Sequence, residues 1–326
     1  MKLSFSHLAF LCVVFLSTGC KTTFRISVQI PAVIDLPKEV KRISIVDQFS
    51  TNKPTTSSIL DGVVSGEQVN GDRIAAQQFS GGMSQSLMKG NYESVVGNPK
   101  VSIQLGNQQQ MDSIFQHDQS QAIVVLTNFD TDAPVGGVVL SDALGQQGYR
   151  LTSHAMIGVY CQNGFQLDQI PISNWVDLPS SGSLNPLALL QDVVNKRKWY
   201  NDLGRVTGFS AGAMFYPNWV WVDRIYYNKG CRELREAKRL IRFGNWDLAE
   251  KKLSPVLSDP LLKRKAKARA SFNLALIYEG EGRLDDAIQM AEKSALEYNC
   301  KYAPIYLRQL KARAATQNTI ELQQGH

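Results

Sequence analysis

The sequence predicts an α+β body followed by an all-α segment, and three observations lead to this fold class. Short apolar runs with the two-residue alternation of strands recur between residues 24 and 227. Helical patterns are mixed among them without regular alternation, which favours a small mixed sheet with helices on one face. After residue 230 helical patterns follow one another and repeat. We therefore expect a signal peptide over 1–19, an α+β domain over 20–230 and a helical-repeat domain over 231–326.

The composition excludes several classes of protein. The chain has 326 residues, 44% hydrophobic and 20% charged, which fits about two globular domains and excludes wholesale disorder. Beyond the N-terminus no apolar run approaches the ~20 residues of a spanning helix, which excludes a multispan membrane protein. Five Cys exclude a disulfide-stapled miniprotein, and four His leave little material for a metal site. Neither a P-loop nor a G-x-G-x-x-G motif occurs, and we expect no cofactor.

The first twenty residues have the architecture of an export signal. A basic start precedes an apolar run over 8–16, which is too short to span a membrane as an anchor. The segment Leu16-Ser17-Thr18-Gly19-Cys20 resembles a bacterial lipobox, although Ser17 stands where Leu is usual. That resemblance implies cleavage before Cys20, acylation of this residue, and a body anchored to a membrane outside the cytoplasm. An ordinary signal peptide with Cys20 close to the cleavage point is the alternative.

The first half of the body predicts two strands and a helix. Residues 24–30 alternate apolar and polar side chains, and 42–46 form a second strand. Residues 50–71 are rich in Ser, Thr, Asn and Gly, which is typical of a loop. A helix over 72–88 follows from the four-residue spacing of Phe79, Met83 and Leu87.

The second half predicts a central strand, a hairpin, a helix and a last strand. The continuous apolar run 122–126 is typical of a strand covered on both faces. Residues 149–161 and 165–172 flank Asn163-Gly164, a strong hairpin signal. Asn185-Pro186 predicts a helix start, and 219–227 a final strand.

The last third repeats at a fixed spacing. Gly244 and Gly282 are 38 residues apart, as are Ala249 and Ala287. The pattern resembles the tetratricopeptide (TPR) repeat of about 34 residues, with an extension around residues 263–266. In this reading small residues let paired helices approach and Gly ends the first helix. The predicted packing residues are Ala237, Leu240, Gly244, Ala249, Leu274, Ala275, Tyr278, Gly282 and Ala287.

Two such units are too few to stand alone. Residues 303–315 are helical in pattern and would cap the stack, but an isolated array needs about three repeats. We therefore expect the array to lean on the α+β body. An unrelated pair of helical hairpins is the alternative to a TPR array.

A wider resemblance covers most of residues 12–300. Segments 31–42, 216–220, 224–227 and 244–249 resemble a family of uncharacterised Gram-negative envelope lipoproteins, with a domain of unknown function ahead of a TPR-like tail. The resemblance implies the order of domains and the location. It implies no activity and no functional residues.

Two motifs suggest other functions. Gly208-Phe209-Ser210-Ala211-Gly212 matches the G-x-S-x-G nucleophile elbow of α/β-hydrolases, which needs a preceding strand and a later His. The only His after Ser210 is His326, so a helix or turn packed against the sheet is the stronger interpretation. The basic run 263–269 could bind phosphate headgroups, an anionic cell-wall polymer or an acidic partner, or simply be a solvated linker and first helical turn.

Two smaller features have ordinary structural interpretations. We interpret Asp130-Thr131-Asp132 as a turn rather than a cation site. Five tryptophans could stack on sugars or serve as core anchors: Trp175, Trp199, Trp219, Trp221 and Trp246.

The function predicted from these observations is a non-enzymatic, membrane-tethered interaction scaffold of the cell envelope. The concave face of its repeats would bind an extended peptide or partner helix of an unknown protein, and we expect no nucleic-acid partner. The alternatives are an exported hydrolase using Ser210 and a structural factor that binds anionic cell-wall polymer.

Overall fold

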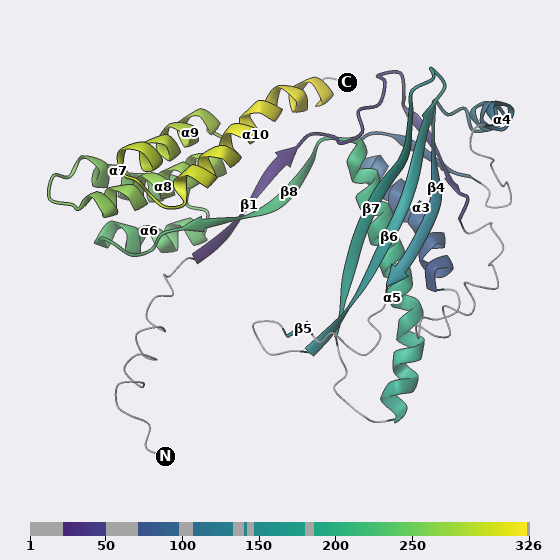
Figure 1. Cartoon of the computed structure of the whole chain (residues 1–326), viewed down its shortest axis with the longest axis horizontal. Coiled ribbons are helices and arrows are strands. Elements are labelled where there is room, and N and C mark those ends of the chain that lie inside the picture. The colour runs from purple at the N-terminus through teal and green to yellow at the C-terminus, as the bar shows by residue number, and fades with distance from the viewer. Residues whose placement is uncertain are drawn as a thin grey trace, which may run out of the picture. The chain divides into compact units, whose positions relative to one another are not determined.

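The computed structural model describes residues 22–49, 71–97, 107–132, 140–141, 147–179 and 186–324. Contacts divide them into two compact units. The sheet unit is the continuous stretch 32–217, and the helical unit combines residues 22–31 with 218–324 (Figure 1). The sequence predicts a boundary at residue 231. The helical unit instead includes both flanking strands, because they pair with each other.

The sheet unit contains a mixed six-stranded sheet of order β3-β2-β4-β6-β5, with β7 also paired to β6. Strand β2 runs parallel to both β3 and β4, whereas β6 is antiparallel to its neighbours. The strands are β2 (Arg42–Asp47), β3 (Glu93–Val96), β4 (Ala122–Asp132), β5 (Leu140–Ser141), β6 (Gln147–Cys161) and β7 (Gln166–Pro179).

Local sequence explains the centre of this sheet. The apolar run 122–126 is fully buried at the start of β4, which confirms a central strand. The hairpin predicted from Asn163-Gly164 joins β6 to β7. Gly164 has φ +86°, and the Asn163 side chain accepts a hydrogen bond from the Phe165 amide at 3.1 Å. Gly164 therefore supplies the left-handed backbone conformation of the turn, and the Asn163 side chain stabilises the turn.

Helices cover both faces of the sheet, whereas the sequence predicts helices on one face. Helices α3 (Gly71–Lys89) and α5 (Pro186–Gly212) pack against each other and share a core with alternate residues of β4, including Val124. Helix α4 (Gln108–Asp118) buries Met111 against the intervening residues Ile123 and Val125. Because successive strand residues point to opposite faces, α4 lies on the other side. A short 3₁₀ turn, η1 (Ala213–Phe215), follows α5.

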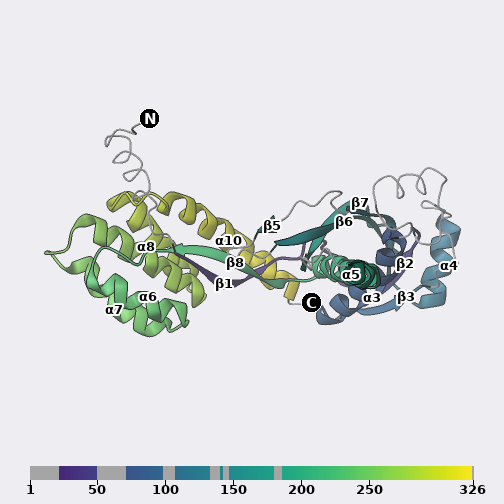
Figure 2. The same cartoon turned by 90° about the horizontal axis from the view of Figure 1, so that it is seen from below.

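The helical unit combines a two-stranded ribbon with five helices (Figure 2). The ribbon pairs β1 (Thr22–Ile30) antiparallel to β8 (Asn218–Tyr226), in register from Thr22↔Tyr226 to Ile30↔Asn218. The helices are α6 (Arg232–Arg242), α7 (Trp246–Ser258), α8 (Arg264–Gly280), α9 (Leu284–Glu292) and α10 (Ala303–Gln324). A π-helical turn, η2 (Lys293–Glu297), extends α9.

Candidate interaction surface of the helical unit

The helical unit contains two helix pairs, α6–α7 and α8–α9, related by the 38-residue spacing. Gly244 and Gly282 lie in the tight turns of the two pairs and have φ +65° and +79°. Only glycine adopts this left-handed conformation readily, so both glycines end the first helix of their pair.

The predicted packing residues lie at matching places in the two pairs. Ala237 and Ala275 are 38 residues apart, as are Ala249 and Ala287, and all four are fully buried in the helical core. Leu274 and Tyr278 are buried as well, and Leu240 is half-buried. Seven of the nine positions therefore belong to or pack against one helical core, and the two glycines lie in the turns of the helix pairs.

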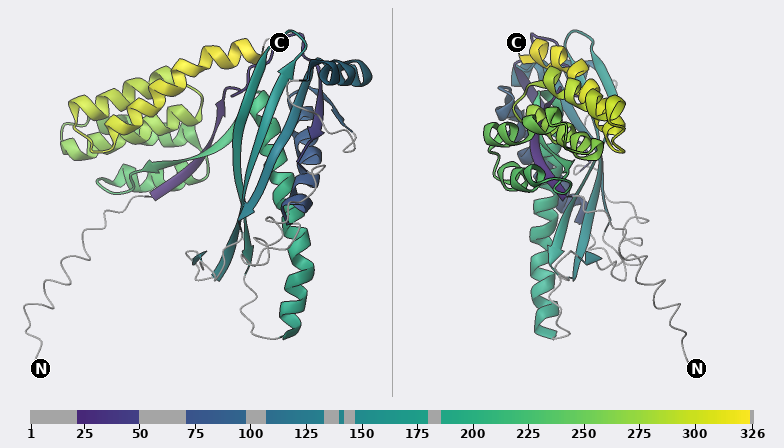
Figure 3. Two further views of the ribbon diagram at one scale, coloured as in Figure 1. Left: turned by 45° about the vertical axis from the view of Figure 1, so that its right-hand side comes forward. Right: turned by 90° about the vertical axis from the view of Figure 1, so that its left-hand side faces the viewer.

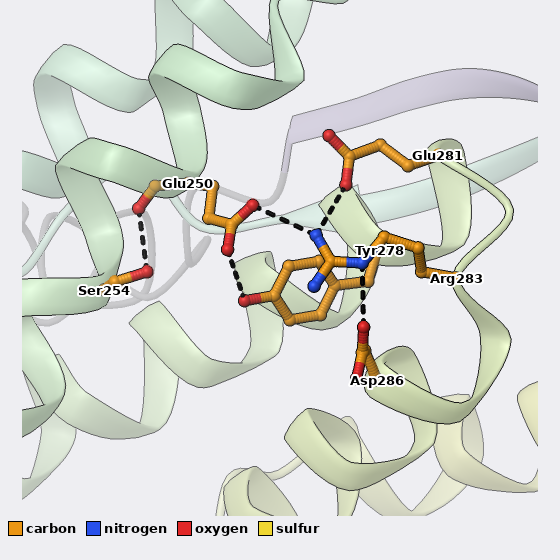
Figure 4. Close-up of polar contacts among 6 residues, drawn as sticks. All are labelled: Glu250, Ser254, Tyr278, Glu281, Arg283 and Asp286. Carbon is orange, nitrogen blue, oxygen red and sulfur yellow. Dashed lines mark hydrogen bonds and ion pairs between the residues drawn. The ribbon is translucent and has the colours of Figure 1, made fainter.

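A polar network joins the first pair to the second (Figure 4). The Tyr278 hydroxyl of α8 donates to Glu250 of α7 at 2.9 Å. The Arg283 guanidinium lies 4.2 Å from the Tyr278 ring centroid and donates to Glu250 at 3.2 Å and Asp286 at 2.7 Å. Burial, reinforced by the Glu250 carboxylate, raises the pKa of Tyr278 to about 12. The phenol therefore stays protonated as a donor, and the stacked guanidinium fixes its ring.

The ribbon occupies one face of the helices (Figure 3). Strand β8 contacts α8 and β1 contacts α10, and Ile26, Val28 and Tyr226 belong to the helical core. The Asn273 side chain of α8 exchanges two backbone hydrogen bonds with Tyr227, at 2.7 and 2.8 Å. The sequence predicts that the short array leans on the α+β body. Within the described residues it is the ribbon that supports the array, and it covers the face of α8 and α10.

A buried ion cluster holds the ribbon to these helices. The Arg224 guanidinium of β8 donates twice to the Glu279 carboxylate, each time at 2.8 Å. Tyr306 donates to the same carboxylate at 2.6 Å, and Arg313 at 3.3 Å. Burial alone would raise the pKa of Glu279, but Arg224, Tyr306 and Arg313 outweigh burial and lower that pKa.

This cluster is not among the predicted site residues, although the sequence contains a signal for it. Val220, Val222 and Arg224 occupy alternate positions of β8 and so share one face of the strand. A charged residue that continues an apolar face requires a buried partner, because an isolated buried charge is very costly. The identity of that partner depends on the tertiary fold.

Large apolar side chains are exposed at several places on the helical unit. Besides the two surfaces described next, the exposed side chains are Leu261, Leu296, Ile305 and Leu322. Where α6 turns into α7, Phe243 in the turn is 79% exposed, and Leu248 in the first turn of α7 is 47% exposed. At the positions 38 residues later, the chain has Glu281 in the α8–α9 turn and Asp286 in the first turn of α9. Since the second turn forms with charged residues at these positions, the Phe and Leu are not required by the turn itself.

Another exposed apolar surface is the outer face of the ribbon. Trp219 and Trp221 lie two residues apart on β8, on the side away from Val220 and Val222, and are 64% and 71% exposed. Their partners on β1 are Gln29 and Ser27. Arg25 and Asp223 form an ion pair at 3.1 Å on the same face. This face is therefore aromatic and carries no net charge from its ion pair.

The G-x-S-x-G motif lies inside helix α5, so it does not form a strand-to-helix elbow. Gly204, Gly208 and Gly212 form a stripe where α5 contacts α3; a Cβ on Gly208 would lie 1.9 Å from the Phe79 carbonyl oxygen. Ser210 accepts a hydrogen bond from the Asn174 amide at 2.6 Å. These glycines therefore allow the backbones of α5 and α3 to approach closely. The sequence interpretation of a helix or turn packed against the sheet is right about the helix, but the motif packs against helix α3.

The side chain of His154 lies next to Ser173. Its Nδ1 lies 3.0 Å from Ser173 Oγ across the β6–β7 pair, and its Nε2 lies 3.6 Å from an Asp132 carboxylate oxygen. The second distance exceeds hydrogen-bond range, and the side chains of His154 and Asp132 are 55% and 65% exposed. The three residues form a row across an open sheet face rather than a tightly coupled set.

The remaining sequence candidates occupy separate places. Cys20 lies outside the described residues. Residues 130–132 belong to strand β4, so the predicted turn is wrong; Asp72 accepts from the Thr131 amide at 2.9 Å. In the basic run, Lys263 and Lys265 are exposed, whereas Arg269 donates to the Lys229 carbonyl at 2.6 Å.

The described residues can be compared with the requirements of a membrane-spanning helix and of a metal site. They contain no helix long and apolar enough to cross a membrane. They also contain no group of three or more His, Cys, Asp or Glu side chains placed to hold a metal ion.

Comparison with known proteins adds family relationships without an activity. No curated protein matches the chain. Among solved structures, a minor lipoprotein from Acinetobacter baumannii aligns with 54% of this chain and 94% of its own, at 8% identity and a TM-score of 0.27. Residues 235–321 match a family described as a domain of unknown function (DUF6340). Residues 40–227, more than half of the chain, match another, and the chain belongs to this family, described as a domain of unknown function (DUF8603).

Proposed function

We propose that this protein is a non-enzymatic, lipid-anchored scaffold of the cell envelope, which binds a protein partner through its helical unit. The lipobox-like segment ending at Cys20 supports the anchor. The two equivalent helix pairs support a TPR-like array, an architecture that commonly serves protein binding.

The partner surface is the α6–α7 turn, with Phe243 and Leu248 as its anchors. The face of α8 and α10 is occupied by β1 and β8, so a peptide does not bind there without displacing the ribbon. The observation that carries the proposal is the difference between the equivalent turns: exposed apolar residues in the first, Glu281 and Asp286 in the second. Aromatic residues, Phe among them, are enriched in the buried core of protein interfaces.

A photoreactive amino acid at position 248 tests this surface in intact envelopes. The matched control is position 286, which is equivalent in the repeat; the Leu248 residue and the Asp286 side chain are 47% and 45% exposed. We expect a discrete protein adduct from position 248 and none from position 286. Equal adducts from both positions, or none from 248, would overturn the assignment of the surface.

Substitution provides the second arm of the test. Phe243→Glu and Leu248→Asp introduce the residue types already tolerated in the second turn, so the unit should fold normally. We expect both variants to lose the adduct from a neighbouring photoreactive position while keeping the wild-type unfolding temperature. Retention of the adduct in both variants would exclude these side chains as anchors.

The anchor is tested separately. Cys20→Ala should leave the precursor uncut or release the body from membranes, because acyl chains supply the attachment. Detergent-phase partitioning of wild type and variant measures this, and equal recovery of both in the aqueous phase contradicts lipidation.

A further inference from the structure

We propose that the outer face of the β1–β8 ribbon rests on the lipid bilayer that holds the anchor, with Trp219 and Trp221 seated in the headgroup layer. This inference rests on acylation of Cys20, which belongs to the function proposed above. It adds a second membrane contact, made by the folded protein itself.

The first argument is the length of chain between the anchor and the ribbon. Cys20 is two residues before Thr22, where β1 begins. Two extended residues span at most ~7 Å, so the start of the ribbon cannot leave the membrane surface. Ser27 and Gln29, the partners of Trp221 and Trp219, are five and seven residues further along β1. At ~3.4 Å per residue, both tryptophans lie within ~25 Å of the start of the ribbon.

The second argument is which face of the ribbon is free. Ile26, Val28 and Tyr226 point toward the helices and are buried in the helical core. The opposite face carries Trp219 and Trp221, which are exposed in the described structure. A ribbon lying along the membrane can therefore present only this outer face.

The third argument is the chemistry of that face. Tryptophan is enriched at membrane interfaces because its ring is largely apolar while its N–H still requires a polar partner. The Arg25–Asp223 ion pair, at 3.1 Å, leaves no unpaired charge between these two residues. The small polar side chains of Thr23 and Ser27 are exposed beside them. Such a surface suits the headgroup layer rather than the hydrocarbon core.

Tryptophan fluorescence in proteoliposomes tests the proposal. The acylated protein, purified from membranes, is reconstituted into phosphatidylcholine vesicles with and without phospholipid brominated close to the headgroup. We expect bromine to quench part of the tryptophan emission. The double variant Trp219→Phe/Trp221→Phe should lose most of that quenching, whereas Trp175→Phe, which removes an indole 54% exposed in the sheet unit, should retain it.

The outcomes separate this proposal from the anchor. Loss of vesicle flotation by the wild-type protein would contradict acylation, and with it both proposals. Flotation with equal quenching in wild type and double variant would overturn the ribbon contact alone. A glycan-binding face would instead show no bromine quenching, together with an emission shift on adding soluble cell-wall glycan that the double variant lacks.

Discussion

Gly81 and Gly82 are neighbours in helix α3, yet an added methyl group would meet different surroundings at each. A Cβ on Gly81 would have no neighbouring atom within 4 Å. A Cβ on Gly82 would lie 2.0 Å from the Arg205 carbonyl oxygen of α5. Gly82 therefore permits the close approach of two helix backbones, whereas Gly81 only lowers the helical propensity of an exposed position.

Alanine substitution should change stability in opposite directions at these two positions. Gly81→Ala should stabilise the sheet unit by about 0.5–1 kcal/mol, because it reduces the freedom of the unfolded chain. Gly82→Ala should destabilise it by at least about 1–3 kcal/mol, because backbone atoms must separate. Urea unfolding followed by circular dichroism measures both, and a loss of equal size in both variants would contradict the helix contact.

Glu279 illustrates how a residue can be structurally central without a motif. Its side chain is fully buried, and its partners come from strand β8 and helix α10: Arg224, Tyr306 and Arg313. Because these partners lower its pKa in the folded unit, ionised Glu279 stabilises the fold above its ordinary pKa of 4.5. That contribution disappears as pH falls through the lowered folded value.

Glu279→Gln should destabilise the helical unit by about 3–5 kcal/mol at pH 7, since two arginines would remain buried without their counter-charge. The variant should also lose less stability than wild type between pH 7 and pH 4, because its side chain does not titrate. Unfolding curves at both pH values measure the two effects. Glu292→Gln, which removes the exposed ion pair with Lys311, is the control and should cost at most about 1 kcal/mol.

At the scale of elements, much of the fold is predictable because the local patterns are strong. The apolar period of α3, the continuous run in β4 and the Asn163-Gly164 turn each determine their own element. The candidate surface is less predictable. Sequence periodicity identifies a strand over residues 24–30, but its partner is almost two hundred residues away. Only tertiary pairing shows that this strand and β8 together cover α8 and α10.

The G-x-S-x-G motif is a second case in which local sequence does not determine the structure. Glycines four residues apart suit both a sharp elbow and a close helix contact, and the sequence alone leaves both open. Continuation of α5 through residue 212 decides in favour of the helix contact. Likewise, Asp130 and Asp132 are of a residue type that favours turns, but strand β4 includes both because they pair with residues of β6.

The equivalence of the two helix pairs predicts equal sensitivity to added volume. Ala249 and Ala287 are both fully buried, so replacement of either by Leu should overpack the pair and cost about 1–3 kcal/mol. Ala315→Leu, at an exposed position of α10, should cost little. Circular dichroism and limited proteolysis should show early helix loss and cleavage within 231–315 for the first two variants only. Wild-type melting of both would remove the structural basis of the 38-residue repeat.

At the scale of the whole molecule, the sheet unit is an insertion in the helical unit. Residues 32–217 leave the ribbon after Ile30 and return at Asn218, and these two residues are direct partners at the end of the β1–β8 pair. The Cα atoms of Ile30 and Asn218, between which the insertion is placed, are therefore about 5 Å apart, as in any two neighbouring strands. The two cores are also distinct sets of residues, since the sheet core and the helical core share no member.

This topology predicts that the helical unit folds without the insertion. A chain joining Ile30 to Asn218 through Asn-Gly would close β1 and β8 as a hairpin, because a two-residue turn suits such a pair. We expect cooperative unfolding of this shortened chain and the same sensitivity to Glu279→Gln as in the full protein, because all four members of the ion cluster are retained. A matched chain starting at residue 218 lacks β1 and should lose cooperative unfolding, because the helical core would then lack Ile26 and Val28. Equal unfolding of the two shortened chains would show that β1 is dispensable and would contradict the ribbon's role in completing the short helical array.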